Sequence, residues 1–486
     1  MSTIQNGKVV LGVDTLLKTK NGAAVKTGLS KRHNLTGKQL CTACVVGLFV
    51  ATGAASVGAQ TWTNVSLDNN WGTATNWSTN TVPNSATATV TIGSPATIAS
   101  PVQDNVSVTV LSLTLNSGSG LVIDNGTHST IGNGTTGTLA NSGVITIDDA
   151  GNGTQLNISG AVTLNGDGTI NLGQTSSVSN TNNGMSGSGT LTNVNNIIQG
   201  YNNYGWTLGG NSIGIVNQTG GKIIANTSGQ SLWVDPNSAS GVVNTGLMEA
   251  TNGGNLVLDG NGGGAFVNTD GTNSGTISAV GTGSTVTLTG GAALSNGTLS
   301  SSGGGAFYAD SGSLANLTNA ATFNIDNSAT VTLIGTINNT GTINVNDAGN
   351  GTRLIIDSAG VTLKGGGTIN LGVQPAANTN NAIGSNNTVS VFTNINNTIQ
   401  GYNNISYTLG SNNLDIVNQA SGTIDANTVG QQLWVDPSAD KGMVNAGLME
   451  ATKGGNLVLT GNGGGAFNNT GGTILATGSG TAGSNT

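Results

Sequence analysis

The 486-residue chain has few charged residues, few aromatic residues, six prolines and two cysteines. Charged residues make up only 7% of it and hydrophobic residues 35%, which is not the composition of a charge-rich disordered chain. After Gln60, five basic residues face 19 acidic ones, so we expect no basic patch and no nucleic-acid partner. Helix also has little support, because Gly, Asn, Thr and Ser dominate and no long apolar stripe of period 3.6 occurs.

The N-terminal region differs sharply from the rest. Seven of the twelve basic residues precede position 40, and an apolar segment, residues 40–59, follows them. This order predicts a signal peptide over residues 1–59 with cleavage after Ala59, although a segment of about 20 residues is also long enough for a membrane anchor. Cys41 and Cys44 both lie in this segment, so their spacing does not predict a redox or metal site. We expect no cofactor.

A long internal repeat organises the remainder of the chain. Residues 198–266 return as residues 399–467 with 48 of 69 positions identical, and shorter matching blocks extend upstream. We therefore predict a duplicated unit of about 200 residues. Its first copy is assigned to residues 94–332 and its second to residues 333–486.

A shorter pattern recurs inside each unit. It consists of a Gly, an alternating strand, a Gly-rich turn and a second alternating strand, and it begins at Gly143, Gly221, Gly246 and Gly275. Alternation places Ile145, Ile147, Leu156, Ile158, Ile223, Ala225, Leu232, Val234, Met248, Ala250, Leu256, Leu258, Ile277, Ala279, Val286 and Leu288 inward. One such unit cannot bury its apolar face alone, whereas stacked units form a continuous core. We therefore predict an all-β fold, a right-handed parallel β-helix (β-solenoid) of roughly 16 to 19 coils, with Asn side chains stacked between coils.

The segment 60–93 precedes the first unit and contains Trp62, Trp71 and Trp77. A cap over the first coil is the favoured interpretation, because a bare sheet edge invites pairing with other chains. A sugar-binding aromatic patch is the alternative.

Possible catalytic groups are few. The string NTDG at 268–271 resembles one polygalacturonase motif, and Asp148–Asp149 supplies a carboxylate pair. However, the pair precedes the string, and the second copy replaces Asp270 with Gly471. The string GNSIG around Ser212 lacks the strand-to-helix context of a nucleophile elbow. We predict no catalytic residue, no metal site and no enzyme.

The most conspicuous polar and aromatic positions lie in the repeated string LWVDP. Alternation directs Trp233 and Trp434 outward, and Asp235 and Asp436 follow them. A Trp beside an acid is able to stack on a sugar ring and to accept its hydroxyl hydrogen bonds, so these four residues form the predicted ligand-binding site. Packing of each Trp under the adjoining Pro turn or a neighbouring loop is the favoured alternative.

The Gly/Asn/Thr coils, the long leader and the Trp-Pro opening resemble the passenger region of bacterial autotransporters and filamentous-haemagglutinin-like adhesins. The resemblance implies a secreted or cell-surface protein, a monomeric rod that contacts a glycan or a host or matrix surface. No strand pattern of an outer-membrane barrel follows, so the resemblance also implies a translocation partner or a barrel that is missing from this chain. A structural surface or biofilm rod and a carbohydrate-active β-helix, a hydrolase or lyase, are the alternatives.

Overall fold

The computed structural model describes residues 4–5, 8–9, 59–148, 150–151, 153–173, 183–207, 210–345, 348, 351–372, 382–408 and 411–477. The chain divides into two units, Met1–Ala55 and Ser56–Thr486. In the first unit, β1 (Ile4–Gln5) pairs antiparallel with β2 (Lys8–Val9). The predicted signal peptide, Cys41 and Cys44 otherwise lie outside the described residues. Among the described residues, no helix has the length and apolar character needed to cross a membrane.

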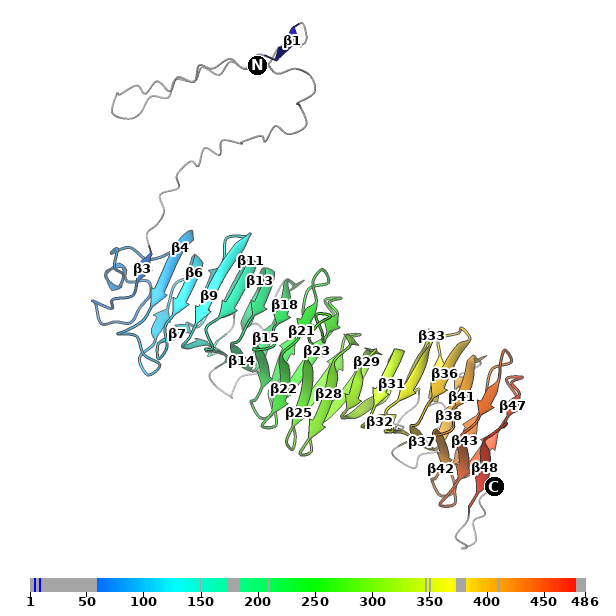
Figure 1. The fold of residues 1–486 in the computed structure, drawn as a ribbon. Coiled ribbons are helices and arrows are strands. Elements are labelled where there is room, and N and C mark those ends of the chain that lie inside the picture. Colours follow the sequence, from blue (N-terminus) through cyan, green and yellow to red (C-terminus); the bar gives the residue numbers. More distant parts are fainter. Residues whose placement is uncertain are drawn as a thin grey trace. The chain divides into compact units, whose positions relative to one another are not determined.

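The second unit is an all-β parallel solenoid of about 14 turns, which confirms the predicted fold class. One sheet system of 42 strands runs from β3 (Gln60–Thr61) to β48 (Thr473–Ala476). Every ladder between its strands is parallel, as in the pairing of β10 (Val144–Ile147) with β12 (Thr169–Leu172). Figure 1 shows successive strands of one face, from β4 (Ser85–Ile92) onward, lying side by side in chain order. The right-handed sense of the coil stays a prediction.

Alternation determines which side chains fill the interior. In β20 (Ser231–Val234) and β23 (Asn255–Asp259), Leu232, Val234, Leu256 and Leu258 are all fully buried. The other positions predicted to face inward are buried too. Because each strand is in register with its neighbours, equivalent apolar residues stack coil on coil, and one continuous core results.

Asparagine side chains form a second, polar element of the interior, as the sequence predicts. Asn217 accepts a hydrogen bond from Asn193 (3.0 Å) and donates one to Asn244 (2.8 Å) on the next coil. Asn418 does the same with Asn394 (3.0 Å) and Asn445 (2.8 Å) in the repeated segment. These side chains are at most 2% exposed, so the ladder satisfies amide groups that would otherwise be buried without partners.

Three tryptophans lie at the N-terminal end of the solenoid. Trp62, Trp71 and Trp77 are each at most 2% exposed, and the ring of Trp77 makes edge-to-face contacts with both others. The indole of Trp71 donates to the carbonyl of Pro83, and that of Trp77 donates to the carbonyl of Trp71. A patch that stacks sugars needs exposed rings, so these three residues serve packing. The domain boundaries stay a prediction.

The number of turns, about 14, is smaller than the roughly 16 to 19 coils that the sequence predicts, and two coils carry an additional hairpin. The short hairpins β16 (Trp206–Thr207) with β17 (Gly210–Asn211), and β39 (Tyr407–Thr408) with β40 (Ser411–Asn412), are antiparallel and separate from the main sheet. A coil that includes a hairpin uses more residues than its strands alone require.

Candidate functional site

Trp233 and Trp434 occupy equivalent outward positions. Trp233 lies on β20 between Asn203 and Val257 of the adjacent strands, and its side chain is half-buried. Both neighbours are only 2% exposed although alternation directs them outward. The large indole therefore shields these two strand neighbours from solvent and leaves part of its own surface accessible. Trp434 on β43 (Gln432–Val435) is likewise half-buried beside Asn404 and Val458.

The two acids of the predicted site are buried, which corrects the expectation of an exposed carboxylate beside each indole. Asp235 is 4% exposed and Asp436 is 3% exposed. The main-chain amide of Gly262 donates to Asp235 (3.2 Å), and that of Gly463 donates to Asp436 (3.0 Å). These carboxylates hold the Gly-rich turn of the next coil against the strand. Binding of a ligand at the four residues stays a prediction, with the indoles as its accessible part.

Two further repeated aromatic residues serve local packing. Tyr201 and Tyr402 are each 4% exposed. A Cβ placed on Gly173 would lie 2.6 Å from the Tyr201 ring, and one on Gly372 would lie 2.5 Å from the Tyr402 ring. Both glycines also have positive φ, so each repeated Gly–Tyr pair requires glycine for two independent reasons. The tyrosines pack against the end of the neighbouring strand.

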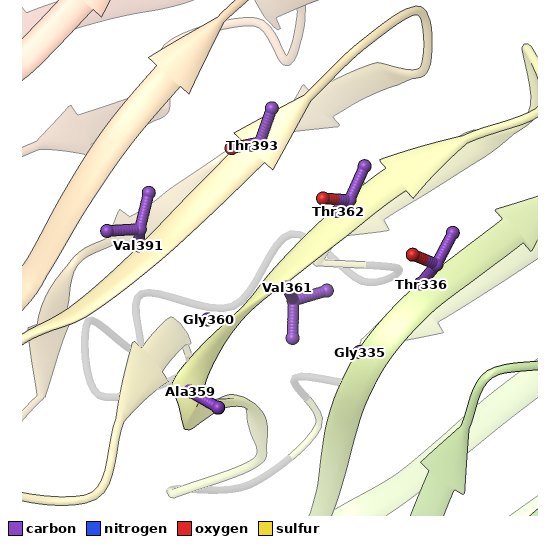
Figure 2. A pocket seen from close by; sticks show the side chains of 8 residues that line it. All are labelled: Gly335, Thr336, Ala359, Gly360, Val361, Thr362, Val391 and Thr393. Carbon is purple, nitrogen blue, oxygen red and sulfur yellow. The ribbon is translucent and has the colours of Figure 1, made fainter.

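A groove of about 310 Å³ opens on the outside of the second repeat (Figure 2). It lies across β31 (Thr322–Asn339), β33 (Arg353–Lys364) and β36 (Ser390–Asn394). Its lining consists of Gly335, Thr336, Ala359, Gly360, Val361, Thr362, Val391 and Thr393. The lining contains no charged side chain.

A bulge in β33 forms one wall of this groove. Leu333 pairs with Ile356, but Gly335 pairs with Val361, so residues 357–360 stand opposite a single residue of β31. The carboxylate of Asp357 accepts a hydrogen bond from the amide of Ala359 (3.0 Å) and closes the bulge. The extra residues therefore stand out beside the strand and deepen the surface next to Thr362.

Three threonines project in the same direction along the groove, as Figure 2 shows. Thr336 pairs with Thr362, and Thr362 pairs with Thr393, so the side chains repeat at the strand spacing of about 4.8 Å. The first repeat contains the same row, which is formed by Thr138, Thr163 and Thr192. In the described part of the chain, the hydroxyl groups of these six threonines have no hydrogen-bond partner.

The groups considered for catalysis do not form a site within the described residues. Asp270 accepts hydrogen bonds from the amides of Asn273 (2.7 Å) and Thr272 (2.8 Å) in an exposed turn, which lower its pKa. Asp148 lies near Asp124, whose pKa is raised by burial and by the Asp148 charge, and Asp149 lies outside the described residues. No group of three His, Cys, Asp or Glu residues able to hold a metal ion occurs in the part of the chain that the structure describes.

The threonine rows were not predicted from the sequence. The signal was present as alternating Thr at corresponding places of both repeats, but a half-buried Thr is also an ordinary strand residue. The shared register and the bulge beside it became evident only in the folded chain.

Compared with known proteins, the chain matches no family model, no curated protein and no solved structure.

Proposed function

We propose that this protein is a secreted or cell-surface β-solenoid of the autotransporter-passenger type that acts in adhesion or surface display and is not an enzyme. A glycan or a host or matrix surface is its proposed partner. The proposed export route is the long leader together with an outer-membrane translocation partner or barrel.

The observation that carries this proposal is the repetition of uncharged polar side chains along the outside of the solenoid. One row of amides runs through Asn344, Asn370 and Gln400, with hydrogen bonds of 2.7 Å and 2.8 Å between successive coils. The threonine rows lie on another set of strands. Repeated rows of uncharged polar side chains offer many equivalent contacts to an extended surface. Many weak contacts of this kind add up to strong attachment.

Array binding by the purified 60–486 segment tests the proposal. The segment is applied to glycans and extracellular-matrix proteins, alongside a Trp233→Ala/Trp434→Ala double variant. We expect saturable binding by the unaltered segment and weaker binding by the variant. Tyr308→Ala is the matched control, because Tyr308 is an exposed aromatic residue of the same outward row that has no second copy.

A structural surface or biofilm rod is the second candidate function. It is favoured by the half-buried state of Trp233 and Trp434, which cover neighbouring side chains. If the folded protein binds nothing on the array, the structural rod replaces adhesion as the proposed function.

A further inference from the structure

We propose that the groove across β31, β33 and β36 binds an extended, uncharged polysaccharide chain that lies along its threonine row. This inference rests on the proposed adhesive function and names the site and the ligand class. The row formed by Thr336, Thr362 and Thr393 crosses three adjacent strands, so a ligand that contacts all three runs from coil to coil.

The chemistry of the row suits a sugar polymer. Each threonine presents a hydroxyl group, which both donates and accepts, and a methyl group. The three hydroxyl groups have no partner in the described part of the chain, although the surrounding strands satisfy their main-chain groups. A chain with many hydroxyl groups supplies donors and acceptors to each of them, while the methyl groups and Val391 contact the apolar faces of its rings.

The charge distribution favours a neutral ligand. No residue that lines the groove carries a charge. Asp415, the ladder neighbour of Val391, is 2% exposed and accepts hydrogen bonds from the Ser438 hydroxyl and from the main-chain amide of Lys441 (3.0 Å). That carboxylate faces the protein. An anionic polymer would find no counter-charge in the lining and would approach a segment that is itself strongly acidic.

The wall beside the row lies on a different strand in each repeat. Residues 357–360 of β33 raise it beside Thr362. In the first repeat, residues 132–135 lie between β8 (His128–Ile131) and β9 (Thr136–Asn141) and stand opposite two residues of β11 (Gln155–Asn165). The groove of about 310 Å³ is formed at the second-repeat row, so we place the ligand there, with Thr362 as the central residue.

Affinity electrophoresis through gels that contain a soluble neutral polysaccharide tests the inference. Dextran, a mixed-linkage β-glucan and a galactomannan serve as separate probes, with polygalacturonate as the anionic comparison. We expect at least one neutral probe to retard the 60–486 segment and polygalacturonate to have no effect. Thr362→Val should weaken the retarding interaction about fivefold, because it removes one hydroxyl and keeps the side-chain shape.

Two variants keep the result interpretable. Thr362→Ser restores the hydroxyl and should recover most of the retardation. Thr298→Val alters a half-buried threonine on β28 (Thr298–Ser302), on another set of strands, and should leave retardation unchanged. The inference is overturned if no neutral probe retards the folded segment, or if Thr298→Val and Thr362→Val reduce retardation equally. If the inference is overturned but the 60–486 segment still binds the glycan and matrix array, the proposed adhesive function stands. If the segment does not bind the array either, the adhesive function is overturned as well.

Discussion

The two copies of the repeated segment differ mostly where side chains face away from the core. Most inward residues are retained, as in Leu232 and Leu433, and so are the ladder residues Asn217 and Asn418. Where an inward residue does change, as from Val242 to Met443, another apolar side chain replaces it. Outward positions have diverged, and Gly214 of the first copy corresponds to Asp415 of the second. A side chain inside a solenoid contacts the coils before and after it, so one exchange disturbs three coils.

One divergent position shows how a polar side chain that points outward but is covered by a loop finds a hydrogen-bond partner in that loop. In the first copy, Asn237 accepts from the amide of Ser240 (2.8 Å) and donates to the carbonyl of Ser212 (3.2 Å), which holds the loop over Gly214. In the second copy, Asp415 accepts from Ser438 and from the amide of Lys441 and holds the same loop. One hydrogen-bonding residue has moved from the loop to the strand, and the loop stays closed.

Asp104, outside the repeated segment, shows what burial does to an inward-facing acid that has few partners. It lies under Trp71 in a small cavity, it is 1% exposed, and its Oδ1 atom has no hydrogen-bond partner within the described residues. Burial raises the pKa of Asp104 to about 7, and the hydrogen bond from Ser129 offsets only part of that effect. The Asp124 charge on the next coil raises the pKa further.

We therefore expect the stability of the solenoid to fall as the pH rises from about 4 to about 7. The raised pKa means that the folded state favours the protonated carboxyl, and this contribution is complete below pH of about 4 and lost above 7. A rise of the Asp104 pKa from its ordinary value of 3.8 to about 7 corresponds to a stability loss on the order of 4 kcal/mol at pH 9. Denaturant unfolding of the 60–486 segment and of Asp104→Asn at pH 5, 7 and 9 measures it. A stability difference between the two proteins that does not change with pH would refute the prediction.

Removing a ladder asparagine should have the next largest effect, and it should be equal in the two copies. Asn217→Ala removes the hydrogen bonds to Asn193 and Asn244 and leaves both buried amides with a missing partner. We expect a loss of about 3 kcal/mol in unfolding free energy, and the same for Asn418→Ala. Denaturant unfolding of each variant measures the loss, and Asn338→Ala, a half-buried outward position, is the control. A difference above about 1 kcal/mol between the two copies would break the equivalence of their interiors.

These residues also show what sequence reasoning was able to predict. Alternation identified Leu232, Leu256 and their equivalents as inward, because a strand fixes the side of each residue by period alone. The Asn ladder was predictable because Asn is abundant in the sequence and because equivalent positions stack from coil to coil in a solenoid. The burial of Asp235 did not follow, because the covering turn at Gly262 comes from the next coil. The groove beside Thr362 depends on a bulge. A bulge is a feature of how two strands pair, and the sequence of one strand alone does not predict it.

Exchanging the residues that hold the loop should change the free energy of unfolding by a smaller amount. Asp415→Gly removes the acceptor for Ser438 and for the Lys441 amide, and it introduces glycine into a strand. We expect a loss of about 1 to 2 kcal/mol in unfolding free energy. Adding Ser438→Asn recreates the arrangement of the first copy and should recover about half of that loss. Denaturant unfolding of the single and double variants gives the coupling. No recovery would mean that the two loops are held by different contacts.

The smallest effect is expected where the outward row of the second copy contains two adjacent acids. Asp425 of the second copy replaces Ile224 of the first and lies beside Glu450 in register. Burial raises the pKa of Glu450, and the Asp425 charge raises it further. In Asp425→Ile, the pKa of Glu450 should fall toward its ordinary value without reaching it, because burial of the carboxyl persists. NMR titration of the Glu450 carboxyl measures this shift. If the pKa of Glu450 is unchanged in Asp425→Ile, burial alone sets that pKa. The two copies would then differ here in shape rather than in charge.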